Sequence, residues 1–302
     1  MSNNNLQPVF LWTTFYKEFA DALLKYKNNR KELLATLSDI YKNLEINYPF
    51  MKNGNPYEDI CPFTVFGCFN KGITNENRIA LMTAMGDKLG VTAAVPDEFD
   101  GIPVLSNMNA WFFGCKTDRK GRDIPNLWGV FEAGIHYADA PSDITRASFI
   151  SCYDRARVQY GIKWNLSVGL YWIRPYAFVT LDAVGRDFLM KRESLTSNEL
   201  ANVSDLRQPP DAITYLRLVD TLLNCFKNQD ISYHSFPEFS YAAWLAVVAA
   251  KGNGKVFPLS DISQGNTSDT NKRHYWLYSP DSFNWDEFHA QGIMSIRWDE
   301  LG

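Results

Sequence analysis

The spacing of apolar residues is the feature that most constrains the fold of this chain, because it repeats with the period of an α-helix through most of residues 1–250. Between Phe15 and Tyr26, apolar side chains recur at intervals of three and four residues, and Thr14 precedes them as a candidate N-cap. A second stripe begins at Leu33, after an asparagine pair whose second member, Asn29, is placed to cap it. The first part of the chain is therefore predicted to be helical.

Later helices are delimited by residue types that favour helix ends. Thr74 is predicted to begin a helix that Gly90 ends, and Ser142 is predicted to cap another. A proline pair at 209–210 precedes a further apolar stripe. The remaining predicted helices are 125–138, 142–160, 164–173, one with Ile213, Leu216, Val219, Leu222, Leu223 and Phe226 on its buried side, and 239–250, which we expect to be buried on most sides.

Other segments lack this period. Residues 53–56 predict a loop, and residues 91–121, interrupted by Pro and Gly, predict loops or short strands. Polar, Gly-containing residues 251–272 predict a flexible linker, and residues 273–302 read as a strand, a short helix and a strand. The predicted fold is mainly α (α+β): a large helical domain over 1–250 with a short β-containing segment, the linker, and a truncated β-α-β unit.

Charge and composition narrow the range of functions that this chain can have. The chain of 302 residues carries 30 Lys and Arg against 34 Asp and Glu, a net charge of −4, which argues against non-specific polyanion binding but leaves room for a local basic groove. The five cysteines form no CxxC pair, and there is neither a signal peptide nor an apolar run of membrane length. We therefore expect a soluble, cytoplasmic protein without a membrane partner.

Tests for common catalytic motifs give little support for an enzyme. The four histidines are scattered without metal-ligand spacing, so no metal site is predicted. Residues 252–255 resemble the end of a phosphate loop only faintly, because the first Gly and the Ser or Thr after Lys255 are missing. Asp97 with the run Asp118, Arg119 and Lys120 fits a loose nuclease pattern, but the run lies in a predicted turn rather than on a strand.

Asp182 is the one candidate catalytic residue. An apolar helix ending at Pro175 leads to Asp182 and then Arg186, an order loosely similar to the catalytic-Asp region of helix-hairpin-helix DNA glycosylases, although no clear hairpin Gly motif precedes it. The alternative interpretation is structural: Asp182 caps the next helix, and Arg186 is an ordinary surface charge.

Several tryptophans could either pack in the core or line a ligand pocket. Trp164 lies beside an apolar helix, where core packing explains it well. Trp276, Trp285 and Trp298 lie within the short C-terminal unit, where burying three indoles is difficult. Either further chain covers them, or some line a pocket for a flat ligand such as a base.

Several blocks resemble, in the same order, the N-terminal regions of McrB-type proteins, the GTPase subunits of modification-dependent (type IV) restriction systems. They span almost the whole chain. The blocks are 63–74, 99–105, 164–175, 236–241, 284–288, 292–296 and 298–302.

The resemblance implies that the helical region is followed by an EVE-like (PUA-like) barrel that holds a flipped, modified base, and then by an AAA+ GTPase domain. This chain contains only the first elements of such a barrel and no GTPase motif. GTP and Mg, the GTPase domain and the nuclease subunit would therefore lie outside it. The resemblance implies a role in anti-phage defence, with DNA, modified or unmodified, as a partner.

These observations lead to three hypotheses. The first is a non-catalytic DNA-recognition and assembly region without a cofactor of its own, the second a glycosylase-like enzyme using Asp182, and the third a helical scaffold for a protein partner. For the first hypothesis, solvated or salt-bridged charges are the competing interpretation of the basic residues. The predicted DNA contacts are Lys71, Arg174, Arg186, Trp164 and Asn165, and the predicted modified-base pocket is Trp276, Trp285 and Trp298.

Overall fold

The computed structural model describes residues 10–250 except 53–54, 108, 115–118, 191–205, 207, 229–230 and 232. All of them lie in the first compact unit of the chain, Met1–Ser263. The predicted linker 251–272 and the predicted PUA-like segment 273–302, with Trp276, Trp285 and Trp298, lie outside the described residues.

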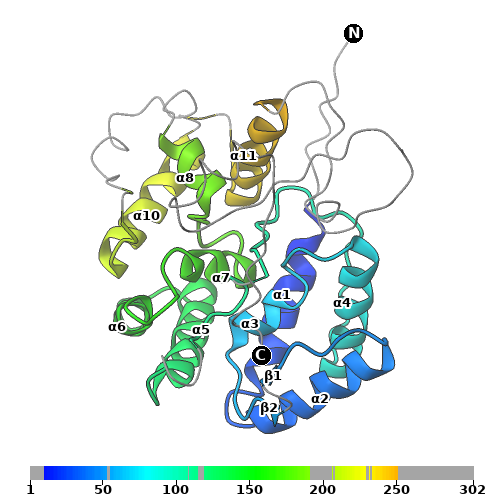
Figure 1. The fold of residues 1–302 in the computed structure, drawn as a ribbon. Coiled ribbons are helices and arrows are strands. Elements are labelled where there is room, and N and C mark those ends of the chain that lie inside the picture. The colour runs from blue at the N-terminus through cyan, green and yellow to red at the C-terminus, as the bar shows by residue number, and fades with distance from the viewer. Residues whose placement is uncertain are drawn as a thin grey trace, which may run out of the picture. The chain divides into compact units, whose positions relative to one another are not determined.

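The described part of the chain is mainly α-helical, as the apolar periodicity predicts (Figure 1). One two-stranded antiparallel hairpin accompanies the helices, with Met51 opposite Pro56. The elements are α1 (Trp12–Leu24), α2 (Arg30–Asn43), β1 (Met51–Lys52), β2 (Asn55–Pro56), α3 (Pro62–Gly67), α4 (Asn75–Leu89), α5 (Asp123–Asp139), α6 (Asp143–Arg157), α7 (Asn165–Ile173), α8 (Ala183–Met190), α10 (Ala212–Asn228) and α11 (Phe236–Ala250).

Local capping chemistry fixes several helix ends where the sequence predicts them. The Thr74 hydroxyl accepts from the backbone N–H of Asn77 at 3.3 Å, and α4 ends at Gly90, whose φ of 78° is left-handed. Ser142 caps α6 in a reciprocal capping box with Thr145.

Some local predictions are wrong. Asn29 stands at the N-cap position of α2, but its side chain accepts no capping hydrogen bond and its amide donates to the Glu32 carboxylate. Thr14 is not the cap of α1, because the helix begins two residues earlier, where the buried Trp12 packs on Tyr171 with ring centroids 5.7 Å apart. Residues 53–56 are not simply a loop, because Asn55 and Pro56 form β2 of the hairpin.

Helix α7 is the centre of the core, in contact with α1, α3 and α5. All its residues after Asn165 are buried. Trp172 stacks on Phe66 with ring centroids 6.3 Å apart, and its indole N–H donates to the Pro103 carbonyl at 3.0 Å. Gly169 allows the Phe63 ring to lie directly against the α7 backbone. The core is thus built from rings, which accounts for much of the aromatic content.

A second group of helices packs beside this core: α5 lies against α6, α6 against α10, and α8 against α11 (Figure 1). Tyr215 on α10 stacks on Tyr153 with centroids 5.2 Å apart, and its hydroxyl donates to the Val179 carbonyl at 2.8 Å. These contacts set the rotation of α10. They leave Ile213 and Leu223 exposed at 53% and 39%, which corrects the predicted buried stripe.

Helix α11 is less buried than its composition predicts. Phe239 packs against Phe188 of α8, and the Ser240 hydroxyl donates to the Gly101 carbonyl at 2.7 Å. The following turns have one buried side only: Ala243 is buried, whereas Leu245 is 42% exposed. Hydropathy alone cannot distinguish a helix enclosed on all sides from one packed along a single side. No helix among the described residues has the length and apolar character needed to cross a membrane.

Candidate anion-binding groove

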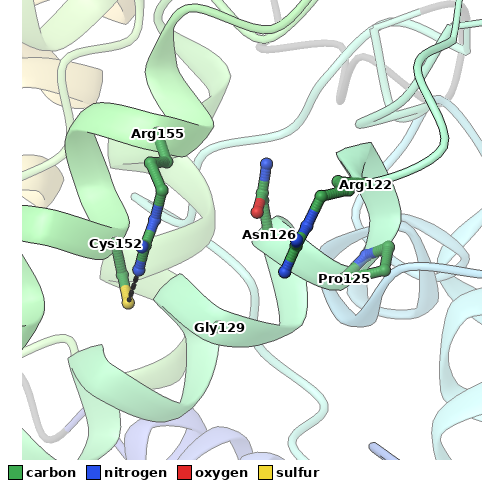
Figure 2. Close-up of a pocket in the computed structure, with 6 residues that line it drawn as sticks. All are labelled: Arg122, Pro125, Asn126, Gly129, Cys152 and Arg155. Carbon is green, nitrogen blue, oxygen red and sulfur yellow. Dashed lines mark hydrogen bonds between the residues drawn. The ribbon is translucent and has the colours of Figure 1, made fainter.

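A groove of about 470 Å³ lies between the first turns of α5 and the second half of α6. Figure 2 shows two guanidinium groups on its opposite sides, with the Asn126 amide between them. The lining residues are Arg122, Pro125, Asn126, Gly129, Cys152 and Arg155.

The local sequence explains how the groove forms. The Asp123 carboxylate turns back to accept from the Lys120 backbone N–H at 2.8 Å, so it lies within the protein and Arg122 is left at the helix start. Across from it, Cys152 and Arg155 are three residues apart and share a face of α6. Gly129 also lines the groove, and a β-carbon there would lie at an ordinary contact distance, 3.8 Å, from Cys152 Sγ.

The charged side chains that line the groove are both positive. Neither Arg122 nor Arg155 forms an ion pair with a described carboxylate, and Arg155 Nη2 donates to Cys152 Sγ at 3.2 Å. Arg119, on the loop before α5, lies over the Phe113 ring at 5.5 Å. Four other arginines among the described residues are paired with carboxylates: Arg30 with Asp59, Arg146 with Asp220, Arg157 with Asp154, and Arg174 with Asp21 and Asp139.

This arrangement suits an anion. Guanidinium groups bind phosphate or carboxylate through two parallel hydrogen bonds, and the first turn of a helix adds partial positive charge. Within the described ranges there is no group of three or more His, Cys, Asp or Glu that could hold a metal ion. The two guanidinium groups of the groove therefore have the chemistry to bind an anionic group, phosphate or carboxylate.

Arg174, a predicted DNA contact, has a different environment. Its side chain is only 4% exposed and is bound by Asp139 and Asp21. Its Nη1 donates to the Ile173 carbonyl at 2.8 Å. Such a guanidinium holds helices together, and its burial argues against a DNA contact.

The other candidates near α7 do come together. Arg186 lies 4.0 Å over the Trp164 ring and donates to the Leu181 carbonyl at 2.6 Å. The neighbouring Asn165 amide donates to the Asn109 carbonyl at 2.9 Å. All three side chains are thus engaged within the protein, and no basic stripe runs from Arg174 to this cluster.

Asp182 acts as the cap of α8. Its carboxylate accepts from the backbone N–H groups of Gly185 at 3.2 Å and Val184 at 3.3 Å, and from the Thr180 hydroxyl at 3.2 Å. Burial raises the pKa of this carboxyl group, and the hydrogen bonds partly oppose that effect. The geometry matches the structural interpretation of Asp182, since its oxygens are turned to the protein's own backbone.

Lys71 lies at a turn between α3 and α4. Its backbone pairs with Leu105 in an isolated bridge, and its side chain is half-buried. The block that contains it, 63–74, is mostly interior: Phe63, Phe66 and Phe69 are fully buried. This part of the family resemblance therefore lies in residues that pack the core.

Sequence reasoning missed the groove. The basic run Arg119, Lys120 and Arg122 before a predicted helix start was a usable signal, as was the Cys152–Arg155 spacing. Neither signal indicated that the two segments meet, because that depends on how α5 packs against α6.

Comparison with known proteins gives a family match without an assigned activity. The model of the family described as Domain of unknown function (DUF8425) matches residues 12–246. The chain belongs to this family. No curated protein matches the chain, and no solved structure matches it. The match to DUF8425 extends from α1 into α11, so the groove lies within the family domain.

Proposed function

We propose that this DUF8425 protein is a non-catalytic DNA-binding region that contacts the DNA backbone through Arg122 and Arg155. The observation that carries the proposal is the pair of arginines that line one groove without an ion pair to a described carboxylate. Their partner in a complex would be phosphate, which matches the fork of each guanidinium.

The modest net charge is compatible with this role. A chain of net charge −4 attracts DNA weakly at long range, so binding depends on the few cations that reach phosphates directly. Arg119 and Lys120 are further cations on the loop that leads into α5.

The wider setting of the proposal comes from the resemblance to McrB-type proteins. In that setting the protein recognises modified DNA in a cytoplasmic anti-phage restriction system, together with an AAA+ GTPase domain and a nuclease subunit. GTP and Mg would act on the GTPase domain rather than on this region. Trp276, Trp285 and Trp298 of the proposed PUA-like segment would take the modified base.

The first test is fluorescence anisotropy with labelled DNA duplexes at two salt concentrations. One duplex is unmodified, and the others carry 5-methylcytosine, 5-hydroxymethylcytosine or N6-methyladenine. We expect binding that weakens as salt rises, and tighter binding to one modified duplex. Absence of binding to every duplex at low salt would contradict the proposal and favour the protein-partner scaffold.

Variants of the groove locate the binding. Arg122→Ala with Arg155→Ala should weaken binding to all duplexes and make the slope of log K against log salt shallower by about 2, because each lost phosphate contact removes about 0.9. Arg217→Ala is the matched control, since Arg217 is an exposed arginine on α10 outside the groove. An equal loss in the control would contradict the assignment to the groove.

The enzyme alternative has one supporting observation: Asp182, Arg186 and Trp164 lie near one another at the start of α8. A base-excision assay on the same duplexes tests it. Release of a base by the wild-type protein, but not by Asp182→Asn, would favour the glycosylase-like activity over non-catalytic binding.

A further inference from the structure

A buried arginine in the helical core carries no counter-charge. Arg78, in the first turn of α4, is 5% exposed and forms no ion pair with a described carboxylate. Its Nη2 donates to the Tyr16 hydroxyl at 3.1 Å and to Asn70 Oδ1 at 2.5 Å, and its guanidinium lies 3.9 Å over the Phe99 ring. All of these partners are neutral.

The hydrogen bonds of this cluster determine which of its polar atoms still need a partner. Asn70 Oδ1 accepts from both Arg78 and Tyr16, the latter at 2.6 Å, so the amide orientation is determined. Two buried atoms of the cluster then have no partner among the described residues, Arg78 Nε and Asn70 Nδ2. Both are donors. The missing partner must therefore be a hydrogen-bond acceptor.

The same side of α1 carries a further unsatisfied donor. Trp12 precedes Tyr16 by one helical turn, and its ring centroid lies 5.0 Å from that of Tyr16. Among the described residues no acceptor meets the buried indole Nε1 of Trp12, whose ring packs on Tyr171. This region of the core thus holds a third buried donor without a described acceptor.

A water molecule would satisfy the two donors but would leave the positive charge uncompensated. An isolated buried cation is unfavourable, and buried charges in proteins are normally paired. The stacked Phe99 ring offsets only part of this cost, since the attraction between a cation and a ring is weaker than that of an ion pair. An anion satisfies both the donors and the charge.

We propose that Arg78 and Asn70 hold a small monovalent anion of the halide class inside the core. Arg78 Nε and Asn70 Nδ2 donate to it, and the Arg78 charge compensates it. Phe99, whose ring lies over the Arg78 guanidinium, belongs to the segment between α4 and α5. The site is separate from the Arg122–Arg155 groove and does not depend on DNA binding.

The test uses bromide as the probe on the full chain. Thermal unfolding is measured while bromide replaces gluconate, an anion too large for the site, at constant ionic strength. Ligand binding to the folded state should raise the midpoint by about 3 °C for each tenfold increase in bromide above the dissociation constant. Anomalous diffraction from a bromide-soaked crystal should give a peak beside Arg78 Nε.

Two variants assign the effect to this cluster. Asn70→Asp supplies a carboxylate that accepts the same hydrogen bonds, so it should remove the bromide dependence while keeping the fold. Arg78→Met should also remove it. Arg186→Met is the matched control, because Arg186 likewise lies over an aromatic ring, at 4.0 Å, but has no buried unpartnered atom. It should retain the full bromide response.

Three results would overturn the proposal. One is a wild-type midpoint that does not respond to bromide together with no anomalous peak beside Arg78 Nε, which would leave water as the occupant. Another is a response that persists in Asn70→Asp, which would place the ion elsewhere. The third is an anomalous peak without any thermal response, which would indicate binding at crystal concentration only.

Discussion

Arg174 and Asp139 form a two-point ion pair, with Nε 2.8 Å from Oδ1 and Nη2 2.6 Å from Oδ2. Nη2 also binds Asp21 Oδ1 at 2.5 Å, so one guanidinium links α1, the end of α5 and the end of α7. The arginine is buried, while its two partners are partly exposed. The pair therefore joins the core to the surface at the point where three helices meet.

Loss of this link should destabilise the fold. We expect Arg174→Met to lower the free energy of unfolding by about 2–3 kcal/mol, less than for a fully buried pair because both carboxylates are partly solvated. Urea denaturation measures the change. Arg146→Met, which removes the 3.4 Å surface pair with Asp220, should cost less than about 1 kcal/mol. Equal losses in the two variants would contradict this interpretation.

The ion pair between Arg174 and Asp139 should make the stability of the protein depend on pH. The hydrogen bonds from Arg174 hold the pKa of Asp139 below its usual range. A carboxyl group with a lowered folded pKa contributes stability above its unfolded pKa of about 3.9, and this stability is lost as the pH falls through the folded value. Asp139→Asn should therefore be less stable than wild type at neutral pH, and the difference should shrink below about pH 4. Unfolding by urea across this range gives the comparison.

Asp182 offers a test of capping against catalysis. Asp182→Ala removes the acceptor for two backbone N–H groups and should cost about 1 kcal/mol. Asp182→Asn keeps a capping oxygen and removes a carboxylate whose pKa burial raises, so its stability at neutral pH should match or exceed that of wild type. A group with a raised folded pKa contributes its stability at low pH and loses it as the pH rises, so the gain should vanish in acid. An Asn variant as unstable as the Ala variant would argue against the cap.

Gly101 should be the least replaceable of the left-handed glycines. Its φ is 76°, and an added β-carbon would lie 2.7 Å from the α-carbon of Tyr241. Gly90 has nearly the same φ, 78°, but open space around it. Gly90→Ala should cost about 1 kcal/mol for the strained backbone, and Gly101→Ala at least twice that. Thermal unfolding of the two variants separates the strain from the clash.

Cys152 should be the fastest of the described cysteines to react with a thiol reagent. Cys61, Cys68 and Cys225 are buried, and burial raises the pKa of Cys61 to about 12. Cys152 is partly exposed in the groove. Mass spectrometry after brief alkylation should find the label on Cys152, and DNA should slow this labelling if the groove binds phosphates. Labelling that DNA leaves unchanged would count against the groove as the DNA site.

The elements that the sequence predicts well are those that depend on neighbouring residues. The Thr74 cap, the Gly90 end and the Ser142 capping box all involve groups within four residues of each other. Such signals can be recognised in the sequence without knowledge of the tertiary structure. The mainly helical fold followed from them and from the apolar spacing.

The elements that the sequence predicts poorly depend on contacts between residues that lie far apart in the chain. Arg174 is a candidate DNA contact in the sequence, but Asp21 and Asp139 lie 153 and 35 residues away from it in the chain. The exposed side of α11 follows from its packing against α8 along one side only. The groove likewise exists only once α5 and α6 lie together, which residue spacing within either helix cannot reveal.

The contact between Phe63 and Gly169 has a consequence for how the family can diverge. The two residues belong to separate sequence blocks, yet the ring of one occupies the volume that a side chain at the other would need. Homologues that gain a methyl group at position 169 should therefore carry a smaller residue at position 63, so that total volume is conserved. Substitutions at these two positions should accumulate as matched pairs, and either change alone should be rare among descendants that still fold.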